Sequence, residues 1–349
     1  MSQIAVGILG ATGIVGQRFI QLLADHPWFE VTAVAASERS IGQRYADACH
    51  WLLPTPMPER VAQLVVGPVE PGLDCRLLFS SLPANVATEL EAQFAQAGYA
   101  VCSNASAHRM DPDVPLLIPE VNADHVALLE VQRARRGWRG WIATSANCSA
   151  TQLALALKPL HEAFGVRALH VTTLQAVSGA GYPGVPSLDI LGNVVPYIRG
   201  EEEKMESEPL KMLGTLRDGR IVEAPFTISA QCNRVPVRDG HTECVSVRFE
   251  HPPDREALID ALSSFRGPDV VSELPSTPRQ TIVVRDEPDR PQPVLDRDAG
   301  GGYTVSVGRI RPCPLLDYKF VVLGHNTLRG AAGGAIHNAE LLAEEGWLA

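Results

Sequence analysis

The chain of 349 residues has no long apolar run and little positive charge, and both gaps exclude classes of protein. Because no stretch of 18 apolar residues occurs, the sequence predicts no membrane-spanning helix. The opening segment MSQIAVGILG also lacks the basic start and cleavage site of a secretion signal. Lys and Arg number 30 against 40 Asp and Glu, whereas nucleic acids and acidic lipids require a basic face. We therefore expect a cytoplasmic protein that binds small molecules and copies of itself, and neither nucleic acid nor membrane.

The cysteines also lack any pattern. Their number is odd, and no CxxC or Cys/His spacing typical of a zinc site occurs. Reduced thiols fit this distribution better than a disulfide framework, and we expect no metal. The seven are Cys49, Cys75, Cys102, Cys148, Cys232, Cys244 and Cys313.

What the chain does have is length and apolar material for two domains, with 45% hydrophobic residues. Residues 1–146 alternate short apolar runs with helical patterns, which predicts a Rossmann-type, doubly wound parallel α/β sheet. Residues 147–325 become β-rich after one helix, which predicts an α+β domain with a mixed or antiparallel sheet. Within it, the Pro- and Asp-rich stretch 285–302 reads as an exposed connection. The Ala-rich segment 326–349 predicts a helix that packs back on the first domain.

A glycine-rich turn between the first strand and the first helix is the first sign of chemistry. Gly10, Gly13 and Gly16 in GATGIVGQ would let backbone amides and the helix N-terminus approach a pyrophosphate. The spacing is GxxGxxG rather than GxGxxG, so tight packing is the alternative. Its position between a strand and a helix favours dinucleotide binding.

The end of the second strand bears on which dinucleotide is bound. NAD-selective proteins usually place an acid there for the ribose, but here Ser37 follows the strand, with Glu38, Arg39 and Ser40 after it. Arg39 and the two serines suit the 2′-phosphate of NADP. Glu38 keeps NAD open, as does an ordinary polar loop.

Cys148 and His241 are the candidates for covalent catalysis. Cys148 lies between the two predicted domains, just before a helix whose unpaired amides would lower the thiol pKa. His241 follows Gly240 at a strand start and could act as acid and base. Arg234 converges with it if Asp239 and Gly240 break the strand. A buried, inert cysteine and a surface histidine are the alternatives.

The charged run GEEEKMESEPLKMLG, residues 200–214, reads by default as a solvated helix. Glu208 and Lys211 are three residues apart and share a helix face. Pro209 fits most easily in the first helical turn, which would place the pair at a helix start beside a cleft.

Several long segments resemble the aspartate-semialdehyde dehydrogenase family, and its archaeal and fungal-type branch in particular. The resemblance covers nearly the whole chain. It implies that NADPH reduces β-aspartyl phosphate to aspartate semialdehyde, on the route to lysine, methionine and threonine. The segments are GATGIVGQRF, ASERSIGQRY, IPEVN, SANCSATQLALALKPL, LQAVSGAGYPG, EEEKMESEPLKMLG, RVPVRDGH and GHNTLRGAAGGAI.

The resemblance also implies residue roles. Cys148 would expel phosphate and form a thioester, and His241 would be the acid and base. The β-rich domain would form the interface of a homodimer or homotetramer. The implied substrate contacts are Gln175 for the acyl group, Arg234 for the α-carboxylate, Glu208 for the α-ammonium, and Lys211, Arg109 and Asn104 for phosphate. The implied cofactor contacts are Gly10, Thr12, Gly13, Ile14, Gly16, Ser37, Arg39, Ser40, Ser178, Gly179 and Asn326, the last near the nicotinamide.

Two other functions compete with this interpretation. A malonyl-CoA reductase of the same branch would use Cys148 and His241 in the same thioester chemistry. A nucleotide-sensing scaffold without catalysis would bind NADP and would not need Cys148.

Overall fold

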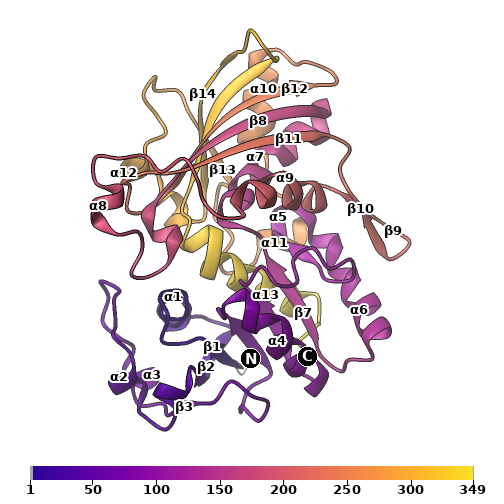
Figure 1. Ribbon diagram of the computed structural model, residues 1–349. Coiled ribbons are helices and arrows are strands. Elements are labelled where there is room, and N and C mark those ends of the chain that lie inside the picture. Colours follow the sequence, from indigo (N-terminus) through magenta and orange to yellow (C-terminus); the bar gives the residue numbers. More distant parts are fainter. Residues whose placement is uncertain (1–2, 349) are drawn as a thin grey trace.

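A seven-stranded sheet organises the first part of the chain in the computed structural model, which describes residues 3–348 (Figure 1). Its order is β3-β2-β1-β4-β5-β7-β6, and every pairing is parallel. The direction of winding reverses between β1 and β4, where nucleotides bind in such sheets. The strands are β1 (Ile4–Leu9), β2 (Phe29–Ala35), β3 (Val66–Gly67), β4 (Leu77–Ser80), β5 (Ala100–Ser103), β6 (Leu116–Leu117) and β7 (Trp141–Ser145).

Helices connect these strands and cover the sheet. Strands β4, β5 and β7 are buried along their whole length, as expected of a parallel sheet covered on both faces. This confirms the predicted doubly wound α/β fold. The helices are α1 (Ile14–Leu23), α2 (Tyr45–Ala48), α3 (Glu59–Ala62), α4 (Ala84–Ala97), α5 (Pro119–Asn122) and α6 (Leu128–Arg136), with the short turns η1 (Glu38–Ser40) and η2 (Ala123–Ala127).

The second sheet has six strands in the order β11-β8-β12-β15-β14-β13. It is mixed, because β8 and β11 are parallel, as are β13 and β14, while the other neighbours are antiparallel. A separate hairpin consists of β9 (Thr215–Arg217) and β10 (Arg220–Val222). The six strands are β8 (Val166–Gln175), β11 (Thr227–Arg234), β12 (His241–Phe249), β13 (Ile282–Arg285), β14 (Val305–Pro312) and β15 (Tyr318–Gly324).

The inner face of the second sheet packs on helices, and the outer face stays open in the single chain. In β12 every second residue is buried, beginning with His241, while Cys244 and Arg248 on the other face are exposed. Apolar residues of α7 and α9 join the inner face in one hydrophobic cluster. The helices are α7 (Cys148–Phe164), α8 (Ser187–Ile190), α9 (Glu201–Met212), α10 (Arg255–Ser264), α11 (Asp269–Ser272) and α12 (Pro293–Asp296), with the turns η3 (Val177–Ala180) and η4 (Ala299–Gly302).

The chain returns to the first sheet at its end. After the π-helical turn η5 (Leu328–Ala332), helix α13 (Gly333–Glu344) buries Ala335, Ile336 and Leu342 in the same cluster as residues of β1 and β4. Figure 1 shows α13 (yellow) beside the indigo and purple elements of the first domain. The first domain therefore contains segments from both ends of the chain.

The stretch 285–302 is a connection with many exposed residues, as its composition predicts, but it is not a simple turn or hairpin, because it joins the parallel strands β13 and β14. It forms α12 and η4, and the Asp296 carboxylate is buried between the guanidinium groups of Arg285 and Arg290. Composition alone cannot reveal this pairing, because a polar stretch looks the same whether its charged residues face solvent or one another. Between residues 3 and 348, no helix is long and apolar enough to cross a membrane.

Candidate active site

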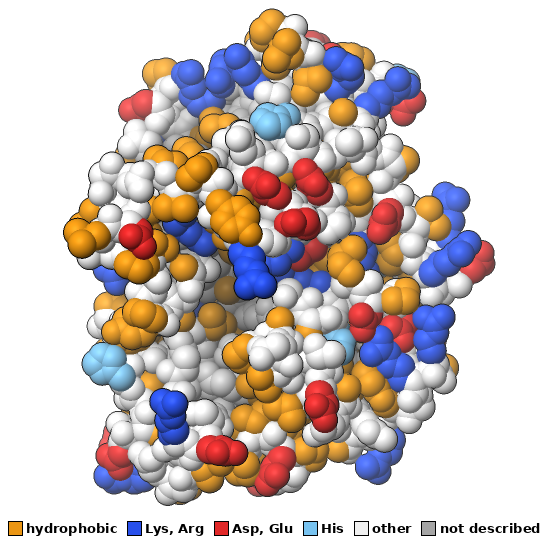
Figure 2. All heavy atoms as spheres, in the orientation of Figure 1, with side chains coloured by type: hydrophobic (Ala, Val, Ile, Leu, Met, Phe, Trp, Pro, Cys, Tyr) orange, Lys and Arg blue, Asp and Glu red, His pale blue; other side chains and the backbone are white. Residues whose placement is uncertain are grey.

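A pocket of about 840 Å³ lies between the two domains. The start of α1, the loop after β4 and residues 104–109 line it from the first domain, while η3, residues 198–204 and Arg234 line it from the second. Figure 2 shows a hollow on this face of the molecule, with Lys and Arg side chains gathered beside it. The pocket therefore combines the nucleotide-binding end of the first sheet with residues of the second domain.

Cys148 lines this pocket, and the buried side chain of His241 contacts Cys148 from behind the lining. Cys148 begins α7, and its Sγ lies 3.3 Å from Nε2 of His241, which begins β12. The other ring nitrogen, Nδ1, accepts a hydrogen bond from the Ala176 amide at 3.0 Å. Because an accepting nitrogen carries no proton, the neutral ring holds its proton on Nε2, which faces the sulfur. Gly330 packs behind the thiol, since a Cβ there would lie 2.8 Å from Cβ of Cys148.

Burial shifts the pKa of both groups away from the neutral range. It raises the pKa of the Cys148 thiol to about 12, and the Glu201 carboxylate adds to this shift. It lowers the pKa of His241 to about 3, and the charge of Arg234 contributes. The expectation of a lowered thiol pKa is thus wrong for the free protein. The amides of Ser149 and Ala150 at the helix start are already bound by Oδ1 of Asn147, and the loss of hydration dominates.

The strand register brings the second-domain residues into one row. Arg234 is paired with Gln175 across β11 and β8, and His241 begins the adjoining strand beside Gln175, opposite Gly324. Gly179 sits over this row, because a Cβ there would lie 2.8 Å from Nη1 of Arg234 and 3.0 Å from Cε1 of His241. The break at Asp239 and Gly240 thus makes the two residues converge, as the sequence suggested.

The glycine-rich turn has the close packing that a nucleotide-binding turn requires. Gly10 adopts a φ of +76°, and a Cβ on Gly16 would lie 2.4 Å from the carbonyl oxygen of Gly10. Helix α1 has no side-chain cap at Gly13, so its first amides face outward. Gly13 and Ile14 line the pocket, and Thr12 in the same turn is half-buried.

The other residues expected to contact the cofactor lie at two places. Asn326 donates to Oγ of Ser178 at 2.8 Å and accepts from the Gly240 amide, and both side chains line the pocket near Gly179. Ser37 directly precedes η1, which contains Arg39 and Ser40. All three lie outside the pocket lining, where Ser37 and Arg39 are exposed and Ser40 is buried.

The structure does not place Glu208 and Lys211 in the pocket. The three N–H groups of Lys211 donate to the carbonyl oxygens of Arg109, Asp111 and Val114, which leaves none for phosphate. Glu208 accepts from Arg109 and from the Asn147 amide, and both side chains are buried. The roles implied for these two residues therefore do not fit the structure.

Glu201 and Lys204 occupy the pocket instead. They have the same spacing as Glu208 and Lys211, one heptad earlier, and line the pocket with their side chains 3.3 Å apart. Helix α9 begins at Glu201, with Pro209 inside it rather than in its first turn. The signal for this pair is Gly200, which directly precedes the acidic run and marks the helix start.

The loop after β5 supplies two further pocket residues. Arg109 is held by Glu208 at 2.9 Å and donates from Nη2 to the carbonyl oxygen of Asn104. Among residues 3–348, the Nδ2 group of Asn104 and the Nε group of Arg109 are buried without a partner. Neither donor is engaged by the described residues, but both atoms are covered by protein rather than open to the pocket.

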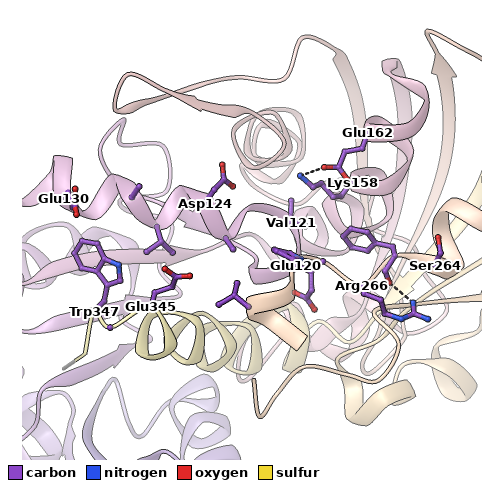
Figure 3. A pocket seen from close by; sticks show the side chains of 18 of the residues that line it. Glu120, Val121, Asp124, Glu130, Lys158, Glu162, Ser264, Arg266, Glu345 and Trp347 are labelled. Atoms are coloured by element: carbon purple, nitrogen blue, oxygen red, sulfur yellow. Dashed lines mark hydrogen bonds and ion pairs between the residues drawn. The ribbon is translucent and has the colours of Figure 1, made fainter. Parts of the chain in front are cut away.

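A larger groove of about 1190 Å³ lies elsewhere, between α6, α7 and the end of the chain (Figure 3). Asp124, Glu130 and Glu345 point into it, and Lys158 is paired with Glu162. The groove contains neither a thiol nor an imidazole. No cluster of three metal-binding side chains occurs among the described residues.

Comparisons with known proteins identify the family. The family description "Semialdehyde dehydrogenase, NAD binding domain" matches residues 5–129, and "Semialdehyde dehydrogenase, dimerisation domain" matches residues 157–329. An aspartate-semialdehyde dehydrogenase from Archaeoglobus fulgidus is 51% identical over 342 residues, which cover 98% of each chain. The chain belongs to the aspartate-semialdehyde dehydrogenase family. This confirms the resemblance seen in the sequence.

Other members of the aspartate-semialdehyde dehydrogenase family agree in sequence and structure. The protein of this name from Cryptococcus neoformans is 49% identical, with 99% of this chain and 98% of its own covered. The crystal structure from Candida albicans, described as a complex with NADP, superposes with a TM-score of 0.91 at 47% identity, covering 99% and 100% of the two chains. These archaeal and fungal relatives match the predicted branch.

Proposed function

We propose that the chain is an NADP-dependent aspartate-semialdehyde dehydrogenase, which reduces β-aspartyl phosphate to aspartate semialdehyde and releases phosphate. The observation that carries the proposal is the 3.3 Å approach of Cys148 to His241 in a pocket that also contains Glu201, Lys204 and Arg234. A substrate with an ammonium, a phosphate and a carboxylate group offers an opposite charge to each of the last three. The names of the relatives support this activity.

The covalent step belongs to Cys148. Its sulfur attacks the acyl carbon while the thiol proton passes to Nε2 of His241; the bond to the phosphate oxygen breaks, phosphate leaves with the electron pair, and a thioester forms. His241 donates from Nε2 in its present state and so stabilises the thiolate. To accept a proton at Nε2, the ring must adopt the other tautomer and give up the bond from Ala176. A carboxylate bound by Arg234 would offset the arginine charge and raise the pKa of His241.

We assign the substrate groups by charge and by free hydrogen-bonding capacity. Arg234 presents its planar fork to the α-carboxylate, and Glu201 receives the α-ammonium group. Glu201 is held for this by Asn147 at 2.9 Å and by Gln175 at 3.0 Å. Gln175 is itself buried outside the pocket lining, so to orient the acyl group its amide must give up Glu201 or Thr173. The phosphate is bound by Lys204 together with Arg109 and Asn104, whose unpaired donors are buried and must be uncovered to reach it.

The glycine-rich turn and the η1 turn fit NADP. The closeness of Gly16 to Gly10 and the uncapped start of α1 provide a cradle for a pyrophosphate. Gly10, Thr12, Gly13, Ile14 and Gly16 would form this cradle, and Ser178, Gly179 and Asn326 the nicotinamide side. Ser37, Arg39 and Ser40 would bind the 2′-phosphate. When bound, NADPH supplies the hydride that reduces the thioester.

The matched dimerisation domain indicates self-association. We propose a homodimer or homotetramer that assembles through the open face of the second sheet. All seven cysteines are free, which agrees with a reducing compartment, and we place the enzyme in the cytoplasm.

One assay tests the activity against its alternatives. Purified protein is mixed with aspartate semialdehyde, NADP and phosphate, and separately with malonyl-CoA and NADPH. We expect NADP reduction that depends on phosphate in the first mixture and no turnover in the second. Turnover of malonyl-CoA alone would replace the proposal with the reductase, which the names of the relatives do not favour. Absence of turnover in both would favour the nucleotide-sensing scaffold.

A further inference from the structure

Strand β12 carries a buried acid that the proposed reaction does not use. Glu243 lies two residues after His241 on the same face of the strand and has no exposed surface. Within residues 3–348, neither of its carboxylate oxygens has a hydrogen-bond partner. A buried carboxylate is normally paired with a cation or with several donors, because leaving it charged and unpaired costs several kcal/mol or more. The position of Glu243 therefore requires an explanation.

The strand register places Glu243 directly beneath the reacting groups. It is paired with Thr173 on β8 and with Val322 on β15, and Thr173 is paired in turn with Cys232 on β11. The next row above contains Arg234, Gln175 and His241. The row below contains Val171 and Val245, which belong to the hydrophobic cluster. Glu243 thus lies in a polar layer between the proposed active site and the apolar core.

The groups around Glu243 favour a neutral carboxyl group. Burial raises the pKa of Glu243 well above its usual range, and the charge of Glu201 on α9 adds to the shift. Burial also raises the pKa of the Cys232 thiol to about 12 and lowers that of His241 to about 3, so both neighbours on the sheet are uncharged near pH 7. The neighbours on β8 and β15, Thr173 and Val322, do not titrate. Over residues 3–348, no cation lies within hydrogen-bonding distance of the Glu243 carboxylate.

We propose that Glu243 is a positioning residue that stays protonated beneath the active site, so that Glu201 is the single negative charge on this wall and receives the substrate ammonium group. Glu243 acts through Glu201, and the proposal rests on the function proposed for that residue. A second negative charge would repel Glu201, which Asn147 and Gln175 hold in place. It would also oppose formation of the Cys148 thiolate, which the charge of Glu201 already disfavours.

Infrared difference spectroscopy of the free enzyme tests the protonation state. A protonated carboxyl group has a carbonyl stretching band that a carboxylate lacks. We expect this band to be lost in Glu243→Gln and retained in Glu208→Gln, the matched control, because Glu208 is paired with Arg109. An identical band in wild type and Glu243→Gln at neutral pH would overturn the proposal.

The pH dependence of the same band tests the coupling to Glu201. Removing the Glu201 charge should lower the pKa of Glu243, so the band should disappear at a lower pH in Glu201→Gln than in wild type. An unchanged titration would show that the two acids do not interact and would overturn the proposal. Neither measurement needs substrate, so both remain decisive if the proposed activity fails.

Rescue by a conservative change tests the functional part. We expect Glu243→Ala to lower kcat/KM for aspartate semialdehyde about tenfold, because it opens a cavity beneath Thr173 and Gln175. Glu243→Gln should recover most of this loss, since an amide has the size and the neutrality of the protonated acid. If Glu243→Gln were as impaired as Glu243→Ala, the neutral group would not suffice and the proposal would be wrong.

Discussion

Helix α9 contains two Glu–Lys pairs with the same spacing of three residues, and the two pairs have different surroundings. Glu201, Glu208 and Lys211 are all buried, but Glu201 and Lys204 line the pocket between the domains, whereas Glu208 and Lys211, one heptad later on the same stripe, do not. The first pair retains charge that a ligand can use. The second pair is bound by other protein groups. Lys211 donates to three carbonyl oxygens of the loop that carries Arg109.

The difference shows that spacing along a helix does not determine whether a charge is functional. What decides is whether the side chain lines the pocket and, for the two lysines, how many N–H groups the protein has engaged: Lys211 donates to three carbonyl oxygens, whereas Lys204 donates to Glu201. Both pairs still serve one site, because Glu201 accepts from the Asn147 side chain and Glu208 from the Asn147 amide, directly before Cys148. The first pair should therefore control catalysis, and the second the stability of the loop and the helix start.

The largest effect should come from Cys148, because both Glu–Lys pairs of α9 contact Asn147, which directly precedes it. Cys148→Ala should reduce turnover of aspartate semialdehyde by on the order of 10⁴-fold or more, since the covalent step is lost. NADP affinity, measured by fluorescence titration, should stay near that of wild type, because the glycine-rich turn is intact. Activity within tenfold of wild type would show that Cys148 is not the nucleophile, and the two Glu–Lys pairs of α9 would then not serve a common catalytic residue.

The two glutamates should separate activity from stability. Glu201→Gln should lower kcat/KM for aspartate semialdehyde about 100-fold, through loss of a charge-assisted contact worth about 1.5 to 3 kcal/mol, with little change in Tm. Glu208→Gln should instead lower the free energy of unfolding by about 1 to 3 kcal/mol, because Arg109 and the Asn147 amide lose an ionised acceptor. Steady-state kinetics and thermal unfolding of both variants make the measurement. Equal kinetic losses at full stability would contradict the division of α9.

The two lysines provide the corresponding test for phosphate. Lys204→Met should raise the KM for phosphate roughly tenfold and affect the KM for aspartate semialdehyde less, since a half-buried point charge that lines the pocket is lost. Lys211→Met should mainly lower Tm, because three buried carbonyl oxygens lose their donor. If Lys211→Met raised the KM for phosphate as strongly with unchanged Tm, the ammonium group would have to reach the ligand directly.

The sequence predicts the fold of this protein better than it predicts which charged residues line the active site. Periodicity located the strands and helices of the first domain, because buried parallel strands are short apolar runs and their helices are amphipathic. The glycine turn, Cys148 and His241 were found for local reasons, as each stands at the junction of a strand or helix. The choice between Glu201 and Glu208 depends on contacts with residues 109–114 and 147, which spacing cannot reveal. The raised pKa of Cys148 likewise follows from tertiary burial.

The preference for NADP over NAD should not depend on either Glu–Lys pair of α9. Arg39→Ala should reduce the preference for NADP over NAD by about tenfold, the lower range for a charge-assisted contact, because Arg39 is exposed. The ratio of the two catalytic efficiencies is the measured quantity, with Glu201→Gln and Glu208→Gln as controls that should leave it unchanged. An unaltered ratio in Arg39→Ala would assign the 2′-phosphate to Ser37 and Ser40.

The smallest effect should be seen in the reactivity of the Cys148 thiol in the free enzyme. Because the Glu201 carboxylate helps to raise the pKa of this thiol, Glu201→Gln should lower that pKa and increase the thiolate fraction at any pH below it. Alkylation by iodoacetamide at pH 8, followed by mass spectrometry at Cys148, should then be about 3 to 10 times faster than in wild type, which corresponds to a shift of up to one pKa unit. Glu208→Gln should change the rate much less, since the Glu208 carboxylate is paired with the Arg109 guanidinium. A slower reaction in Glu201→Gln would mean that Glu201 does not oppose the thiolate, and the electrostatic part of the contrast within α9 would be wrong.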